Sequence, residues 1–412
     1  MHIHVVSKSN NAEHTTISLN PAISPLPPSS IRVKPELVSL TSNNLSYARS
    51  GHILRWWDTY PVPSNSPAPY NDQSTWGIVP AWGYGIVLES TTSLLPGTRL
   101  WGFWPTANTS VDLTVTPGQP DGTWIETSPH RQALMPLYNR YAVAYDQEKD
   151  RMAWSTVFNG TWRAGYLLSE YVLNPLQPIH PLGASAGLPW TAEDADVSSA
   201  VVIALGASAK TARLFTYNFA RRSANLPLGY LLVSSSPEPL ISPAASSGFP
   251  VRAVSYDELE KSADWLADRK PTKLVIVDFG GRGDSLRRLC ELIKHTEGLK
   301  TSKRVIIHVG GQQKVYTSEE VQAARDAMVA EGKIQYNTAG VQDTLLQGNI
   351  PDDYLNAVNK RWNQWLDERN VAIPDMRLVW GSGVDGPQGI DGGWQRLCHG
   401  DVGSEEALVY EL

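Results

Sequence analysis

One stretch of the chain, residues 201–219, constrains the fold more than any other. Val201–Leu205 is a continuous apolar run, as expected of a strand in a parallel sheet with both faces covered. A turn of small residues and then a predicted helix follow it. Small side chains let main-chain N–H groups approach an anion, and a helix start adds partial positive charge. The stretch is typical of either a nucleotide diphosphate site or an ordinary strand–helix corner.

The turn departs from both common phosphate-binding motifs. The dinucleotide motif has three glycines, whereas this turn has Gly206 alone. Of the P-loop pattern only Lys210 and Thr211 are present. The residues expected to contact a phosphate are Gly206, Ala207, Ser208, Lys210 and Thr211.

Strands and helices alternate from residue 197 onward. The expected strands are Val201–Leu205, Tyr230–Val233, Val251–Val254, Leu274–Val277 and Val305–Val309. Helices are expected over residues 284–294, 318–330 and 352–368. This alternation predicts an α/β domain with a doubly wound parallel sheet.

The sequence pattern predicts mainly β-strands in the first 190 residues or so. Short strands at 2–6 and 15–19 are expected to pair, and 31–34 has the alternation of a half-buried strand. The segment 76–89 predicts a strand with glycine kinks, which suits a curved sheet. Residues 137–144 and 152–157 are assigned to this β-rich part as well, and Ala407–Leu412 is expected to be a terminal strand.

Composition narrows the classes of function. With 412 residues and 42% hydrophobic residues, the chain is long enough for one very large or two ordinary domains. The formal charge of −6 offers no electrostatic argument for binding nucleic acid or an anionic membrane. No apolar run reaches the length of a membrane span, and the N-terminus lacks the apolar core of a signal peptide.

The two cysteines, Cys290 and Cys398, are far apart in the sequence. Lone thiols fit a reducing compartment, so a cytoplasmic protein is expected. Neither belongs to a Cys-x-x-Cys pair, and no metal ligands are predicted. His130, His308 and His399 are the histidines most easily imagined as catalytic. None of them has a Ser or Cys nucleophile at a known motif spacing, so structural or surface roles are expected.

Further landmarks fall in the order of a known family. Residues 40–47 resemble an early segment that faces the nicotinamide, and 80–87 resemble a glycine-kinked strand. Residues 96–103 resemble a Gly-Asp-x-Val-x-Gly strand, with Thr98 where Asp is usual. Two later strands resemble the fourth and fifth of a Rossmann sheet; they end in Asp278, Gly280 and Gly281, and in Gly310 and Gly311.

Together these segments resemble the medium-chain dehydrogenase/reductase superfamily, on its zinc-free, quinone-oxidoreductase-like side. The turn at 208–212 is most similar to a little-characterised microbial branch of it. The resemblance implies a β-rich GroES-like substrate domain (1–185), a Rossmann nucleotide-binding domain (186–340) and a segment that returns to the first domain (341–412). It also implies a small-molecule substrate and, since many relatives dimerise, a homodimer.

By the same resemblance, the nicotinamide lies between the two domains. Tyr47 is then the expected proton or hydrogen-bond donor to the substrate oxygen, and Asn44 orients the cofactor. Trp82 and Tyr138 are expected to contact substrate, with Tyr138 and Tyr141 as reserve donors. A packing role remains the alternative for each aromatic residue.

The second strand of the α/β domain predicts the choice of cofactor. An acidic residue at its end would bind the ribose of NAD, but this strand ends in Ser234, Ser235 and Ser236. Serine hydroxyls, helped by Lys210 or Arg252, would instead hold a 2′-phosphate, so NADP(H) is favoured.

Three functions are compatible with these observations. The first is an NADPH-dependent, zinc-independent reductase of an activated C=C or C=O, enone or quinone-like, acting in secondary metabolism. The second is a non-redox isomerase, lyase or dehydratase that uses the same interdomain cleft. The third is a binding protein with a relict nucleotide fold. The reduced glycine motif favours the second and third functions over the first.

Overall fold

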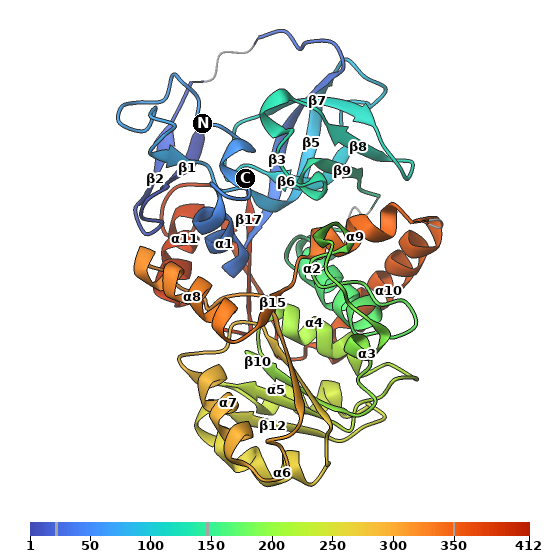
Figure 1. Cartoon of the computed structure of the whole chain (residues 1–412). Coiled ribbons are helices and arrows are strands. Elements are labelled where there is room, and N and C mark those ends of the chain that lie inside the picture. The colour runs from blue at the N-terminus through green and yellow to red at the C-terminus, as the bar shows by residue number, and fades with distance from the viewer. Residues whose placement is uncertain (21–23, 146–147, 349–350) are drawn as a thin grey trace. The chain divides into compact units, whose positions relative to one another are not determined.

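The computed structural model describes residues 1–20, 24–145, 148–348 and 351–412. The chain forms two compact units (Figure 1). Unit 1 comprises Met1–Asn159, Gln313–Thr317 and Met376–Leu412, and unit 2 comprises Gly160–Gln312 and Ser318–Asp375. These ranges differ from the domains expected from the sequence, because residues 160–185 and 341–375 pack within unit 2. The two segments contact each other through the edge-to-face pair of Trp162 and Trp362, whose ring centroids are 5.7 Å apart.

Unit 2 contains a six-stranded parallel sheet, as predicted. Its spatial order is β12-β11-β10-β13-β14-β15, which is the 3-2-1-4-5-6 order of dinucleotide-binding folds. The strands are β10 (Ala200–Leu205), β11 (Gly229–Ser234), β12 (Val251–Ser255), β13 (Lys273–Asp278), β14 (Lys303–His308) and β15 (Lys333–Gln335). All five strands expected from the alternation are therefore confirmed, with β15 added at one edge.

Both faces of this sheet are covered, which explains the uninterrupted apolar run of β10. On one face Leu231 and Val233 pack with residues of α6 and α7. The preceding residue in the strand, Tyr230, points the other way and contacts Phe215 and Phe219 of α4. The helices of unit 2 are α3 (Ala192–Ala195), α4 (Lys210–Phe219), α5 (Glu238–Ala244), α6 (Ala263–Ala267), α7 (Ser285–His295), α8 (Ser318–Ala330), α9 (Thr338–Leu346) and α10 (Pro351–Ala372).

Unit 1 is built on an eight-stranded and a three-stranded sheet. The orders are β16-β17-β3-β5-β6-β9-β8-β7 and β2-β1-β4, and a further pairing of β3 with β7 closes six of the strands into a barrel. The strands are β1 (His2–Ser7), β2 (His14–Ser18), β3 (Ser30–Leu40), β4 (Trp76–Gly77), β5 (Ala81–Ser90), β6 (Arg99–Trp104), β7 (Val111–Pro117), β8 (Thr123–Glu126), β9 (Arg140–Val143), β16 (Arg377–Ser382) and β17 (Glu406–Glu411). This is the β-rich, GroES-like part of the predicted fold.

Several local expectations for unit 1 are confirmed. Strands β1 and β2 pair antiparallel, with Ile3 opposite Ile17. The terminal strand β17 pairs with β3, so the end of the chain does return to this unit. Gly83 in β5 permits a close approach of strands, because a Cβ there would lie 2.0 Å from the carbonyl oxygen of Leu37.

Two segments within the part expected to be β-rich are helical. Tyr47 lies on α1 (Ser42–Ser50), and residues 152–157 lie on α2 (Lys149–Leu167). The first helix begins with a capping box between Thr41 and Asn44, a signal that the sequence contains. The second error has a general cause, since a short apolar run has the same composition in a buried strand and a buried helix. The remaining helix of unit 1 is α11 (Ile390–His399), in a region expected to be loop up to residue 393.

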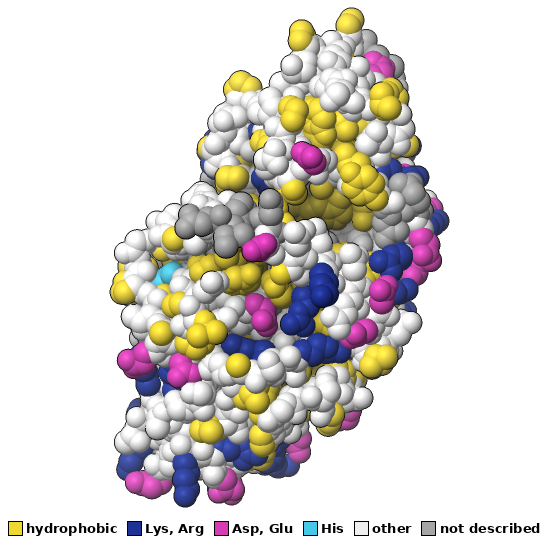
Figure 2. All heavy atoms as spheres, turned by 90° about the vertical axis from the view of Figure 1, so that its right-hand side faces the viewer, with side chains coloured by type: hydrophobic (Ala, Val, Ile, Leu, Met, Phe, Trp, Pro, Cys, Tyr) yellow, Lys and Arg dark blue, Asp and Glu magenta, His cyan; other side chains and the backbone are white. Residues whose placement is uncertain are grey.

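The surface agrees with the mild net charge. On the face drawn in Figure 2, basic and acidic side chains are interspersed. Within the described residues, every helix is too short or too polar to cross a lipid bilayer.

Candidate functional site

The carboxyl ends of three neighbouring strands bring the predicted glycine turns together in unit 2. Leu205 of β10 is in register with Asp278 of β13, which is in register with His308 of β14. The turns that follow therefore lie at one edge of the sheet. Ligands of open α/β sheets bind at this edge, where the strand order reverses.

Main chain meets main chain at this edge. Gly206 has φ +72° and Gly280 has φ +105°, a region that side chains disfavour. A Cβ on Gly206 would lie 3.1 Å from the carbonyl atoms of Gly280, and one on Gly280 would lie 2.5 Å from the oxygen of Gly311. Glycine at these positions is thus a steric requirement. The first turn has one glycine, and the two neighbouring turns place their own glycines, Gly280 and Gly311, close to it or to each other.

The turn after β10 is held firmly from within unit 2. The Ala207 N–H donates to the Val233 carbonyl at 3.0 Å, and the Ala209 N–H donates to the Gly206 carbonyl at 2.9 Å. Helix α4 begins at Lys210 with no side-chain cap at Ala209. The first N–H groups of a helix have no partner within it, so this end of α4 presents donors and partial positive charge.

A buried arginine supports the same turn. The Arg213 Nε donates to the Ser208 carbonyl at 3.0 Å, and its two terminal nitrogens contact Asp375 at 2.6 and 2.8 Å. Burial by itself would raise the pKa of Asp375, but the hydrogen bonds and charge of Arg213 outweigh it and lower that pKa. The ion pair therefore fixes Ser208 without occupying the amides of the turn.

Asp278 organises its own loop. Its Oδ1 accepts the N–H groups of Gly280 at 3.0 Å and Gly281 at 2.8 Å, and its Oδ2 lies 3.5 Å from the Nδ1 of His308. Burial raises the pKa of Asp278, but His308 and the two amides outweigh burial and lower it. The carboxylate is therefore ionised and already engaged. Its charge disfavours a phosphate beside it, although it leaves Oδ2 able to accept from a ribose hydroxyl.

Only some of the residues predicted to select a 2′-phosphate lie at this edge with their side chains accessible. Ser234 is buried, and its hydroxyl accepts the Ser236 N–H at 3.1 Å, whereas Ser235 is exposed. Arg252 pairs in register with Leu231, three residues before Ser234. At about 3.3 Å per residue, its Cα lies roughly 10 Å before the edge. Ser235 and Lys210 are therefore better placed than Ser234 and Arg252 for this role.

Tyr256 is a residue at this edge that sequence reasoning missed. It follows β12 directly, and burial raises the pKa of its phenol. Nearby main-chain groups of Arg282 and Gly206 offset only part of that rise. The phenol thus lies against main chain that a diphosphate would be expected to use. Its position at the end of the third strand was the signal available in the sequence.

Three predicted residues of unit 1 come together in an aromatic cluster. The Trp82 Nε1 donates to the Tyr47 hydroxyl at 3.0 Å, and the Tyr47 and Tyr138 rings are 6.0 Å apart between centroids. Tyr47 is 7% exposed and Tyr138 is 8% exposed. Burial raises the pKa of Tyr47 to about 12, against the lowering effect of hydrogen bonds with Trp82 and Tyr138. Tyr47 is therefore protonated at neutral pH and able to donate a hydrogen bond.

Asn44 already has partners at both ends of its amide. Its Oδ1 accepts the Thr41 N–H at 2.8 Å, and its Nδ2 donates to the Pro80 carbonyl at 3.0 Å. It is 2% exposed and forms part of the capping box of α1. The structure gives Asn44 a local structural role, and its predicted contact with a cofactor stays a prediction.

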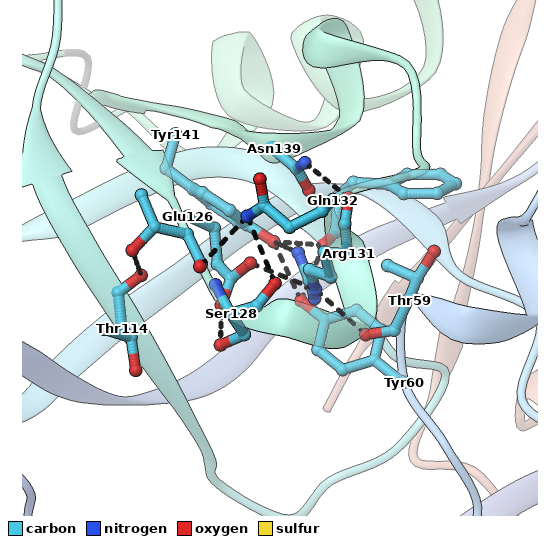
Figure 3. Close-up of polar contacts among 11 residues, drawn as sticks. Thr59, Tyr60, Thr114, Glu126, Ser128, Arg131, Gln132, Asn139 and Tyr141 are labelled. Atoms are coloured by element: carbon cyan, nitrogen blue, oxygen red, sulfur yellow. Dashed lines mark hydrogen bonds and ion pairs between the residues drawn. The ribbon is translucent and has the colours of Figure 1, made fainter.

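A buried polar network accounts for the reserve donor Tyr141. Figure 3 shows Arg131 between Glu126, Tyr141 and Thr59. The Arg131 Nη1 donates to the Tyr141 hydroxyl at 2.8 Å, its Nε donates to the Thr59 carbonyl at 3.0 Å, and its guanidinium stacks 4.4 Å from the ring centre of Tyr60. Tyr141 is fully buried. Its hydroxyl pairs the guanidinium, which is a structural role.

A cavity of about 260 Å³ lies against this network. Arg131, Glu126, Thr59 and Tyr60 line it, together with apolar side chains such as Ile3 and Ile78. His130 is exposed at the same cavity, and His399 is exposed on α11. The surface positions of these two histidines agree with the expectation from the sequence.

Comparisons with known proteins bear on the fold and the family. CurA of Vibrio vulnificus in complex with NADPH superposes with a TM-score of 0.52 at 10% identity, over 100% of this chain and 99% of that one. An Etr1p complex with NADP and crotonyl-CoA gives 0.51 at 11% identity, over 100% of both chains. A mutant enoyl thioester reductase from Candida tropicalis gives 0.50 at 11% identity, over 100% and 99%.

These likenesses establish the two-part fold of the medium-chain reductases, as the resemblance predicted. No curated protein sequence matches the chain. A family model described as "Protein of unknown function (DUF2855)" matches residues 38–403, which is most of the sequence. The chain therefore belongs to the DUF2855 family.

Proposed function

We propose that the protein is an NADPH-dependent reductase of an activated C=C or C=O in a small molecule, enone or quinone-like. The observation that carries this proposal is the edge where Gly206, Gly280 and Gly311 meet main chain to main chain beside the uncapped start of α4. The three solved structures of the same fold support it, since two of them hold NADPH or NADP.

Two features of unit 2 bear on the fit of a dinucleotide. The small turn and the start of α4, which has no side-chain cap, favour it, because main-chain N–H groups at a helix start attract an anion. Tyr256 opposes it, because its hydroxyl lies beside main-chain groups of Gly206 and Arg282. We infer that the diphosphate binds at the 206–211 turn and displaces the phenol. Thr211 and Ser208 would then hold the diphosphate, and Lys210 would reach the 2′-phosphate.

A bound reduced nicotinamide would supply hydride to the substrate. The chain's own part is to hold the cofactor and to stabilise the oxygen that gains charge. We propose Tyr47 for the second role, as its pKa of about 12 keeps the phenol protonated. Trp82 donates to the Tyr47 oxygen at 3.0 Å and so orients it.

Fluorescence titration with NADPH and with NADH tests the cofactor, and an enone and quinone panel tests the reaction. We expect saturable NADPH binding that is tighter than NADH binding, and oxidation of NADPH by at least one substrate class. NADPH binding without oxidation would point to the alternative, a non-redox isomerase, lyase or dehydratase. If neither NADPH nor NADH binds in the titration, the proposed function is excluded.

A further inference from the structure

Three side chains with metal-binding atoms converge in unit 1. They are His4 on β1, His14 on β2 and Asp391 in the first turn of α11. The His14 Nδ1 lies 3.1 Å from the His4 Nε2 and 3.1 Å from the Asp391 Oδ1. The remaining separation, from the His4 Nε2 to the Asp391 Oδ1, is 3.9 Å.

Hydrogen bonding alone does not satisfy this group. If the His14 Nδ1 carries a proton and donates it to Asp391, the His4 Nε2 must be an acceptor and the proton of His4 moves to Nδ1. That Nδ1 is buried and has no hydrogen-bond partner in the described structure. If instead the His4 Nε2 donates to His14, the unprotonated His14 Nδ1 faces the Asp391 oxygen at 3.1 Å. Each tautomer leaves either a buried orphan or two opposed lone pairs.

The local fold sets up this convergence. His4 pairs in register with Thr16, and Val6 pairs with His14, so the two histidines are diagonal neighbours on one face of the hairpin. Trp394, one helical turn after Asp391, packs against the His4 ring at 5.5 Å between centroids. Its Nε1 donates to the Asn11 carbonyl at 2.9 Å, in the loop between β1 and β2. Helix α11 is thereby held over the hairpin with its aspartate toward the histidines.

We propose that His4, His14 and Asp391 bind a zinc ion. Zinc takes His nitrogen and carboxylate oxygen at about 2.0–2.2 Å, and a tetrahedral arrangement then separates ligand atoms by roughly 3.3–3.5 Å. Two of the separations here are slightly shorter and one is longer, so small side-chain shifts suffice. The Asp391 side chain is 30% exposed, which leaves a path for the ion and a place for water as the fourth ligand.

The ion would fasten the first hairpin to the last helix of the chain. Asp391 and His14 are 377 residues apart, so the site joins the two ends of unit 1. Cysteine spacing gave no sign of it, because none of the ligands is a cysteine. The expectation of no metal ligands rested on that spacing.

The test uses the full-length protein without a polyhistidine tag. After exposure to zinc and exhaustive dialysis, we expect about one zinc per chain by elemental analysis. We expect His14→Gln and Asp391→Asn to lower zinc affinity by at least about tenfold, since even a lost outer partner of a ligand costs this much. The exposed His52 is the control, and His52→Gln should retain the metal.

Two further measurements separate specific binding from nonspecific binding. Zinc should raise the thermal unfolding midpoint of the wild type and of His52→Gln, with a smaller rise for the two ligand variants. Cobalt should give visible absorption bands in the wild type that are lost in Asp391→Asn. The proposal is overturned if the wild type retains no stoichiometric zinc, or if all four proteins bind it equally. NADPH binding is not part of this test, so its outcome is independent of the proposed function.

Discussion

Arg213 and Asp375 form a two-bond ion pair beneath the turn that follows the first strand of the parallel sheet. The two contacts are 2.6 and 2.8 Å, and the Arg213 side chain is 3% exposed. The same guanidinium holds the Ser208 carbonyl at 3.0 Å. The stability of unit 2 and the shape of the candidate phosphate site therefore depend on one residue.

Replacing Arg213 with Met should destabilise the protein by about 2 kcal/mol, because it leaves Asp375 and the Ser208 carbonyl without a charged donor. Urea unfolding of the full chain measures this. Arg221→Met is the matched control, since its ion pair with Glu368 is more exposed, at 27% and 36%, and should contribute about 1 kcal/mol or less. Equal losses in the two variants would contradict the supporting role of Arg213.

The same pair predicts a pH dependence. The pKa of Asp375 is lowered in the folded protein, where Arg213 outweighs burial. A lowered carboxyl pKa gives stability that is present above the unfolded-state pKa, about 3.9, and is lost as pH falls through the folded-state value. The difference in unfolding free energy between the wild type and Asp375→Asn should therefore shrink as pH falls below about 4. A constant difference across that range would rule the linkage out.

Tyr256→Phe should tighten NADPH binding. Its hydroxyl lies beside main-chain groups of Gly206 and Arg282, and its removal leaves those groups to the diphosphate. One neutral hydrogen bond contributes about 0.5–1.5 kcal/mol, so the dissociation constant should fall about 2- to 10-fold. Fluorescence titration decides the matter, with Tyr230→Phe, a buried tyrosine paired to Thr216, as control. Weaker binding in Tyr256→Phe would mean that the phenol contacts the cofactor instead.

Lys210→Ala should weaken NADPH more than NADH, by about tenfold or more, because a charged hydrogen bond to the 2′-phosphate contributes about 1.5–3 kcal/mol. Calorimetry with each cofactor provides the comparison. Lys261→Ala removes an exposed lysine that pairs with Glu258, and it should leave both affinities unchanged. Equal effects of Lys210→Ala on the two cofactors would refute the 2′-phosphate role.

Tyr47→Phe should lower turnover at least about tenfold and leave the affinity for NADPH nearly intact, since it removes a donor to the substrate oxygen and keeps the ring. Tyr138→Phe, in the same cluster, should lower turnover less. Steady-state rates with the best substrate of the panel, beside cofactor titrations, separate the two effects. Unchanged turnover in Tyr47→Phe would remove this residue from the mechanism.

Tyr141→Phe should instead act on stability. The variant leaves the Nη1 of the buried Arg131 without its partner at 2.8 Å, at a cost of about 1–3 kcal/mol. Urea unfolding should show this loss while NADPH affinity stays the same. A variant as stable as the wild type would show that the network of Figure 3 tolerates the loss of this hydrogen bond.

The parallel sheet, and the edge at which its turns meet, could be predicted from the amino-acid sequence alone. Buried parallel strands such as Val201–Leu205 are apolar throughout, and Asp278, Gly280, Gly281, Gly310 and Gly311 follow strands whose register is imposed by the sheet. Apolar runs and glycine turns were enough to predict this sheet, because the chain order of strands and helices restricts its topology to a few arrangements.

The roles of the polar side chains, by contrast, follow from the packed fold and could not be predicted from the sequence. Asn44 has its amide engaged by Thr41 and Pro80, Ser234 caps its own loop, and Tyr256 reaches main chain of the first and fourth strands. His14 meets Asp391 across 377 residues. Hydrogen bonds and metal ligation depend on distances of about 2–3 Å between atoms that the sequence separates widely, and such distances are set only when the whole core has packed.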